Sequence, residues 1–288
     1  MTGVPYVAPT SLPFGDGTVT RRVNLEPVIF FGGGRALLLQ VAHPLVAAGV
    51  ADHSDYERDP WRRLARTLDV MMKMAFGAPA ESARRARALE LRHRAVTGTS
   101  PDGVPYRAGD PKLLLWVWAT LVDTALTVYE RCYGPLSTRD RERFYQEQKL
   151  LAQACGVPLD VCPATFPEFV GYFDAVVADD LRVTDQARAV AVAVTGPVLR
   201  WPLGPLAAAP LRLVTAGLLP PTLRAGYGMA WGRDDERRLA WLFRVAGAAS
   251  GVVPRPVRVL PSLALLRSRR PLMPPRFLQA PAVTGVRG

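Results

Sequence analysis

The chain has 288 residues, of which 49% are hydrophobic and 21% are charged, so it can bury a sizeable core and is not wholly disordered. Its formal net charge is +11, but the basic residues are scattered, which argues against nucleic-acid binding because that function needs a clustered basic face. The three cysteines include no CxxC pair, which excludes a zinc ribbon or a thioredoxin-type site. Their odd number and the lack of a recognisable secretory leader predict a cytoplasmic protein, with membrane contact that is at most peripheral.

Three regions are expected along the chain. Residues 1–27 are rich in Gly, Pro and Thr and predict an irregular N-terminal arm. Residues 28–251 show helical patterning without an internal repeat or linker, which predicts a single helical domain. Residues 252–288 are rich in Pro and Arg and predict a loosely attached tail.

Helix start signals divide the central region. Asp110 precedes a proline in the N-cap pattern, and the stretches at 137–140 and 165–168 resemble capping boxes. The predicted helices lie near 28–50, 60–76, 80–97, 111–133, 138–155, 167–179, 184–195, 208–218, 221–230 and 233–247. Alternation with period two is almost absent apart from 104–107, so the fold class is all-α.

The segment 195–221 is apolar and contains five prolines. One interpretation is a set of short core helices joined by proline turns. The other is a membrane-facing surface, which prolines disfavour because they leave backbone groups unsatisfied in lipid.

His93 lies on a predicted helix among several arginines. At 100° per residue, Ala86, Leu89 and Val96 fall within about 60° of His93, whereas the arginines lie at least about 80° away. The imidazole therefore points with the apolar stripe, either as a core histidine bonded to a carbonyl or as an axial ligand to a buried metal or haem.

The predicted helix at 60–76 is cationic at its start and apolar afterwards. Arg63 and Thr67 are four residues apart on one face, with Arg66 beside them. This pattern suits an anionic group, such as a haem propionate, at one end of an oily pocket. It equally suits a solvated helix start with surface salt bridges.

His43 precedes a proline inside the predicted helix 28–50. Pro44 cannot donate to the Gln40 carbonyl and should kink the helix there, which aims the imidazole into a cavity or leaves it as a capped core residue. The triple glycine at 32–34 allows close backbone approach. His53 is expected in a turn, and Asp123, within an apolar helix, needs an arginine or histidine partner if it is buried.

Taken together, these blocks resemble a known helical family that contains the rubber oxygenases (latex-clearing proteins) and the mpaB-type oxygenases of fungal meroterpenoid pathways. The resemblance covers about residues 28–235 in order and is carried by RALLLQVAHPLVAAGVADHS, DPWRRLART, HRAVTGTSPDGVPYRA, DPKLLLWVWATLVDT and LLPPTLRAGYGMAW. It implies an all-α, globin-like multi-helix bundle that encloses a buried haem b.

The resemblance also implies roles for individual residues. His93 stands where a histidine of the rubber oxygenases ligates the haem iron, and Arg63 and Thr67 match an arginine and a threonine near the haem. Arg66 stands where those enzymes have a lysine. His43 lies in the region of their distal glutamate base, which this chain lacks.

The resemblance therefore implies a haem b-dependent oxygenase in which O₂ binds at the open iron position and the substrate is hydrophobic, unsaturated and isoprenoid-like, whereas the residues by themselves indicate only a haem pocket. His93 is the expected metal ligand, Arg63 and Thr67 are expected to bind the cofactor, and His43 and Arg66 are the expected catalytic residues. The alternative is a non-catalytic haem-binding or lipid-binding helical protein at the membrane periphery.

Overall fold

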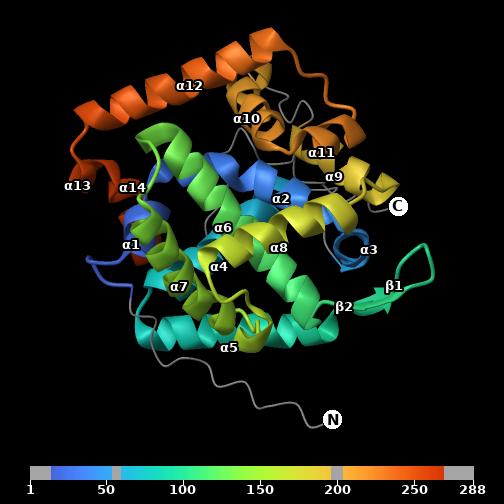
Figure 1. Cartoon of the computed structure of the whole chain (residues 1–288). Coiled ribbons are helices and arrows are strands. Elements are labelled where there is room, and N and C mark those ends of the chain that lie inside the picture. The colour runs from blue at the N-terminus through green and yellow to red at the C-terminus, as the bar shows by residue number, and fades with distance from the viewer. Residues whose placement is uncertain (1–13, 54–59, 196–203, 269–288) are drawn as a thin grey trace, which may run out of the picture.

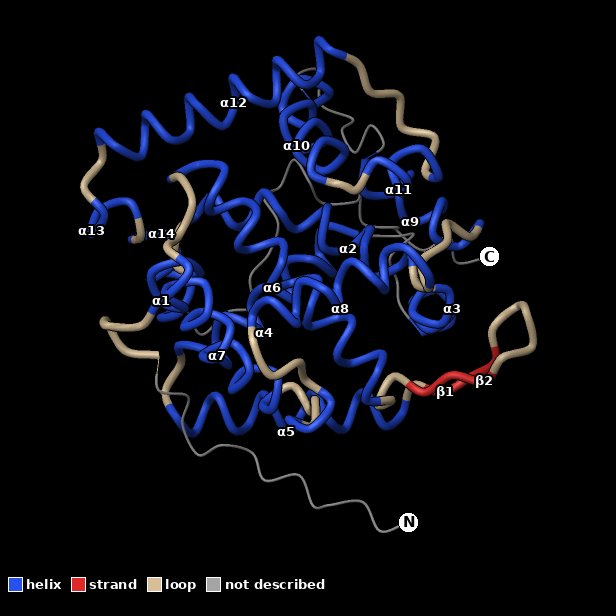
Figure 2. Tube along the Cα trace, viewed as in Figure 1, coloured by secondary structure: helices blue, strands red, loops and turns tan. Residues whose placement is uncertain are grey.

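The computed structural model describes residues 14–53, 60–195 and 204–268; the ends of the predicted arm and tail, at 1–13 and 269–288, lie outside this part. Helices dominate, and β1 and β2 form the only strand pair in the described residues, which confirms the all-α prediction (Figures 1 and 2). The elements are α1 (Val19–Asn24), η1 (Pro27–Gly32), α2 (Gly33–Ala42), α3 (Pro44–His53), α4 (Pro60–Phe76), α5 (Pro79–Ala95), β1 (Thr97–Thr99), β2 (Pro105–Arg107), α6 (Pro111–Tyr133), α7 (Thr138–Ala154), η2 (Leu159–Val161), α8 (Phe166–Asp179), α9 (Asp185–Thr195), α10 (Gly204–Leu218), α11 (Pro221–Gly226), α12 (Arg233–Val252), α13 (Arg255–Arg258) and α14 (Leu260–Arg267).

Helices α2 and α6 form the centre of the fold, with the other helices arranged around them (Figure 1). The start of α6 follows the predicted cap, because the Asp110 side chain accepts from the backbone N–H of Lys112 at 2.8 Å and a proline occupies the first turn. Helix α6 is long and apolar enough to cross a membrane, but 67% of its most apolar stretch is buried inside the fold. It is the core helix of this domain.

Helices extend beyond both ends of the predicted domain. Residues 19–24 form helix α1 instead of an irregular arm, and Val19 and Val23 are buried in the main core. At the other end, α13 and α14 continue the fold beyond 252, and α14 packs against α4.

A buried carboxylate joins these two ends. The Glu26 side chain is 2% exposed and accepts hydrogen bonds from Arg258 at 2.7 Å, Arg255 at 3.2 Å and the Tyr133 hydroxyl at 2.9 Å. A buried carboxylate is tolerated only when it is paired and hydrogen-bonded in this way. The segment after α12 is therefore attached firmly up to the described residue 268, in contrast to the expected loose tail.

Helix α2 is held by a second buried ionic group. The Arg35 guanidinium contacts the Asp123 carboxylate at 2.6 Å and donates to the Thr124 hydroxyl at 2.6 Å on α6 and to the Leu218 carbonyl at 2.7 Å at the end of α10. This is the arginine partner that the sequence required for Asp123. Close packing at the triple glycine accompanies it, because a Cβ at Gly34 would collide with the Thr215 side chain of α10.

The kink predicted at Pro44 is confirmed as a sharp elbow. The axis from Pro27 to Ala42 turns by 106° into α3. His43 has extended backbone angles, as expected for a residue before proline. Its backbone N–H donates a hydrogen bond to the Gln40 carbonyl at 3.2 Å. The predicted single helix 28–50 is thus a 3-10 turn and two helices.

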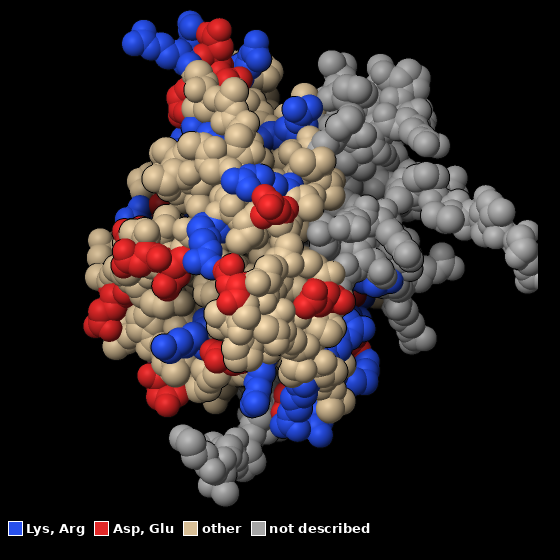
Figure 3. All heavy atoms as spheres, turned by 90° about the vertical axis from the view of Figure 1, so that its right-hand side faces the viewer, with Lys and Arg blue, Asp and Glu red and all other residues tan. Residues whose placement is uncertain are grey.

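The proline-rich segment 195–221 contains α10, and residues 196–203 lie outside the described part. Val214 and Leu218 of α10 are buried, and the helix packs against α2 and α12. This favours the interpretation as core helices. On the face shown in Figure 3, acidic and basic side chains are interspersed over much of the described surface.

Replacing Arg35 with alanine is expected to lower the free energy of unfolding by about 2–4 kcal/mol, because three acceptors inside the fold lose their shared donor. Arg237→Ala is the matched control, since its pair with Asp234 is exposed and such pairs contribute about 0–1 kcal/mol. Urea denaturation followed by far-ultraviolet circular dichroism measures both. Equal effects of the two substitutions would contradict the central role given to Arg35.

Candidate functional site

The α4–α5 hairpin carries most of the residues that the sequence selected. Its two antiparallel helices are tied by Asp69, whose carboxylate contacts Lys73 at 2.7 Å and Arg85 at 3.0 Å. Asp69 and Lys73 are almost fully buried. This tie fixes the register of the pair between Asp69 and Arg85, and His93 lies eight residues after Arg85 on α5.

His93 is half-buried near the C-terminal end of α5. Burial lowers its pKa below the ordinary 6.5, so the imidazole is neutral at pH 7. No hydrogen bond to its ring is formed within the described part of the chain. The neighbouring arginines point outward with one exception, since Arg85 is half-buried against Asp69 and Glu81; the exposed ones are Arg84, Arg87, Arg92 and Arg94.

Helix α4 shows the expected change of character along its length. Arg66 and Thr67 have exposed side chains, Val70 is half-buried and Met74 is fully buried. The side chain of Arg63 lies outside the described atoms. The structure thus places Arg66 and Thr67 on the same hairpin as His93, at the end where the helix meets solvent.

His43 occupies the elbow between α2 and α3. Its ring is half-buried, and its Nδ1 atom is enclosed without a hydrogen-bond partner among the described residues. Burial lowers the pKa of His43, while Asp180 acts against this shift and Arg182 reinforces it. The backbone N–H of Arg182 donates to the Ala42 carbonyl at 2.9 Å, so the connection before α9 also fixes the elbow.

The far end of α3 is attached to the chain that follows His93. The Tyr106 hydroxyl donates to the Asp52 carboxylate at 2.5 Å, and the Nε2 of His53 lies 3.1 Å from the Thr97 carbonyl. Tyr106 is 3% exposed, and burial together with Asp52 raises its pKa to about 12. His53 is the last residue of α3 and not the turn residue that the sequence suggested.

The structure therefore connects the two candidate histidines without bringing them into contact. His43 begins the α3 arm, a ten-residue helix that spans about 15 Å, and the other end of this arm is tied to β1, which follows His93. Sequence reasoning missed the Asp52–Tyr106 and Asp69–Arg85 ties. The alternation around 104–107 was the only signal for either of them.

The described residues contain no group of three or more histidine, cysteine, aspartate or glutamate side chains that could hold a metal ion. A centre built from several protein ligands is thus unsupported in this part of the chain. One cleft lies between α9, α10 and α12, and another lies between α4, α5 and α14. Neither is lined by His43, Arg66, Thr67 or His93.

The free energy of unfolding is expected to fall as the pH drops below about 6.5. His43 and His93 have lowered pKa values in the folded protein, so the unfolded chain binds protons first and the folded state loses stability toward the lower, folded pKa values. Urea titrations between pH 8 and pH 5 measure the loss. The variants His43→Gln and His93→Gln should each flatten it, and an unchanged slope in both would contradict the assignment.

Comparison with known proteins identifies the family. Residues 20–248 match the profile described as ER-bound oxygenase mpaB/B'/Rubber oxygenase, catalytic domain. The chain is also similar to uncharacterized protein Rv2237 of Mycobacterium tuberculosis and uncharacterized protein Mb2261 of Mycobacterium bovis, each 30% identical over 225 residues, which cover 76% of this chain and 87% of the relative. No solved structure matches it significantly. The family match runs from α1 into α12 and includes the elbow and the α4–α5 hairpin, so the chain belongs to the mpaB/rubber oxygenase catalytic-domain family.

Proposed function

We propose that this protein is a haem b-dependent oxygenase that acts on a hydrophobic, isoprenoid-like unsaturated substrate. Membership of an oxygenase family supports the general reaction class. The observation that carries the proposal is His93, a half-buried and neutral imidazole on the hairpin that also presents Arg66 and Thr67. The proposed fold detail is a globin-like bundle that encloses the haem beside this hairpin.

The donor set of the described residues fits a haem. A haem iron needs only one protein ligand, and a neutral histidine is the commonest one. His93 meets this requirement because burial keeps its lone pair free of a proton at pH 7. The lack of a larger ligand cluster in the described part agrees with a single-ligand group.

The cationic start of α4 suits the acidic edge of the same group. Haem carries two propionates, which an arginine guanidinium binds well through charge-assisted hydrogen bonds. Arg66 is exposed, so we assign it to a propionate at the solvent edge in preference to a role at bound oxygen. Arg63 and Thr67 complete the proposed cofactor-binding set.

When bound, the haem supplies the activation of O₂ and the oxidative chemistry at the substrate double bond. The task left to the chain is to control protons and water around that reaction. His43 is the candidate for proton transfer. Its enclosed Nδ1 atom has no hydrogen-bond partner in the described part, and its lowered pKa leaves the ring neutral at pH 7. Such an atom accepts a proton as a base or, in the other tautomer, donates a hydrogen bond.

The purified protein is expected to be red, with a Soret band that shifts with carbon monoxide. His93→Ala should abolish the band because it removes the proposed iron ligand. His53→Ala is the matched control, since this third histidine is exposed and contacts the Thr97 carbonyl and the Tyr106 ring, away from the residues assigned to the haem. A colourless protein that takes up no added haemin would overturn the proposal and leave the alternative, a lipid-binding helical protein.

His43→Gln separates catalysis from cofactor binding. The variant should keep the Soret band but lower the rate of O₂ uptake with an isoprenoid probe such as squalene by about 100-fold, since glutamine cannot exchange the proton. In the unaltered protein, the rate should fall only at a pH lower than the ordinary histidine value of 6.5, because burial lowers the pKa of His43. Full activity of the variant would contradict the role given to His43, whereas a red protein without oxygenase activity would favour a haem carrier.

A further inference from the structure

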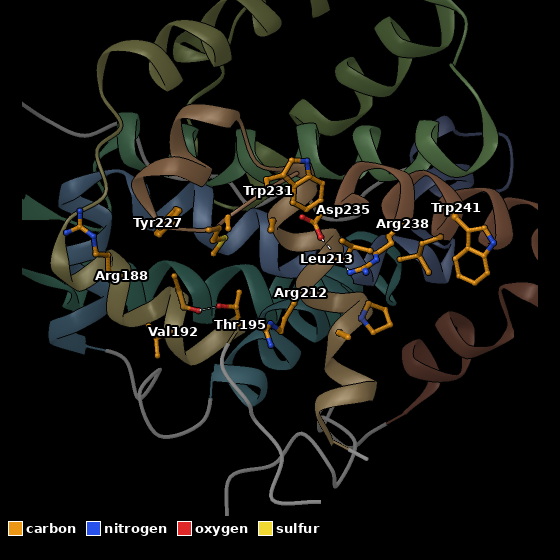
Figure 4. A pocket seen from close by; sticks show the side chains of 18 residues that line it. Arg188, Val192, Thr195, Arg212, Leu213, Tyr227, Trp231, Asp235, Arg238 and Trp241 are labelled. Atoms are coloured by element: carbon orange, nitrogen blue, oxygen red, sulfur yellow. Dashed lines mark hydrogen bonds and ion pairs between the residues drawn. The ribbon is translucent and has the colours of Figure 1, made fainter. Parts of the chain in front are cut away.

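A cleft of about 810 Å³ lies on the opposite side of α9 from the main core. Its walls come from α9, α10, the connection between α11 and α12, and α12 itself (Figure 4). Ala187 and Val190 of α9 are buried in the main core, whereas Arg188 and Val192 face the cleft. The described residues that line it include none of those assigned to the haem site, so this is a second site.

The surface of the cleft is mainly apolar. Leu213 and Ala216 of α10, Met229 of the connection and Leu242 of α12 contribute aliphatic surface, and the side chain of Trp241 is 59% exposed at one end. Clefts of this size and character are typical of small-molecule sites, where an apolar lining is combined with a few placed polar groups.

One wall of the cleft is rigid. The Trp231 indole donates to the Glu236 carboxylate at 2.9 Å, and the Arg224 guanidinium stacks over the ring at 4.5 Å from its centre. Its six-membered ring occupies the space next to Gly217 on α10, where any Cβ would collide with it. An aromatic side chain held on three sides forms a preformed binding surface, which lowers the ordering cost of a ligand.

The charged groups of the cleft are unbalanced. Arg188, Arg212 and Arg238 line it, and Asp235 is the only carboxylate among the described lining residues. Asp235 is already engaged, because it accepts from the backbone N–H of Gly232 at 3.0 Å. Arg212, which lies near the middle of the view in Figure 4, has no carboxylate partner in the described part of the chain. Arg188 pairs with Asp185 at 2.7 Å and Arg238 lies 3.9 Å from Asp235, so Arg212 is the guanidinium that the described cleft offers to an anion.

The back of the cleft is connected to the centre of the fold. Tyr227 lines the cleft, and its hydroxyl donates to the Leu38 carbonyl of α2 at 2.6 Å. Leu38 lies five residues before His43 on the helix that ends at the elbow.

We propose that this cleft binds a single-chain amphiphile with an anionic head, such as a long-chain carboxylate. The apolar chain lies along the aliphatic and tryptophan surface, and Arg212, assisted by Arg188 and Arg238, binds the head. The site does not depend on the haem proposal, because its described lining residues are separate from that site.

Isothermal titration calorimetry with oleate, below its aggregation concentration, tests the proposal on the full-length protein. One oleate is expected to bind per chain, and oleyl alcohol, which has the same chain without the charge, is expected to bind about tenfold more weakly. Arg212→Ala should reduce oleate affinity by about tenfold and leave the binding of oleyl alcohol unchanged. The matched control is Arg244→Ala, an exposed arginine of α12 outside the cleft, which should change neither affinity.

A second variant tests the location of the apolar chain. Ala209 is exposed and lines the cleft, so Ala209→Trp should fill the cleft and weaken both ligands without disturbing the core. Oleate binding that survives Ala209→Trp, or that Arg244→Ala weakens as much as Arg212→Ala, would overturn the site.

Equal affinity for dodecyltrimethylammonium would overturn the anionic selectivity. Binding to phosphatidylglycerol vesicles without binding to dissolved oleate would indicate a membrane surface and overturn the proposal.

Discussion

The buried guanidinium of Arg35 is the constraint on which the rest of this fold depends. It lies on the central helix α2 and is satisfied by a carboxylate and a hydroxyl from α6 and by the last turn of α10. A buried charge tolerates little displacement, because each lost partner leaves a desolvated polar group. Arg35 therefore fixes the rotation and depth of α2 between its two neighbours. The elbow at His43 is the end of that same helix, so its position follows from this contact.

Helix α3 connects the elbow to the strands that follow His93, so the position of the elbow also determines where those strands are attached. The proline at the start of α3 forces the turn, the N–H of Arg182 holds the end of α2, and the Asp52–Tyr106 contact fastens the far end of α3. The position of His43 is therefore set by the proline turn and the Arg182 hydrogen bond, and the chain that follows His93 is held by the Asp52–Tyr106 hydrogen bond. Placing functional groups on rigid elements is the usual way in which a site keeps its geometry.

Much of this arrangement could be predicted from the sequence, because the relevant signals are local. Asp110 marks the start of α6, Pro44 marks the elbow, and the isolated Asp123 in an apolar helix implies an arginine or histidine partner, which is Arg35 in the structure. Helix α1 was missed since six residues are too few for a clear apolar period. The contacts Asp69–Arg85 and Asp52–Tyr106 and the cleft beside α9 were missed for a different reason. They depend on how different helices and strands pack against each other, which no local pattern reveals.

The Glu26 carboxylate has a consequence for the order in which the molecule is made. Its partner Arg258 is added to the growing chain 232 residues later. Until that residue emerges from the ribosome, the N-terminal helices surround an acidic group whose counter-ions do not yet exist. Folding of this part of the chain is therefore completed only after Arg258 has been synthesised. Because Glu26 needs the arginines of α13, a nascent chain that stops short of α13 retains an unneutralised charge in its interior.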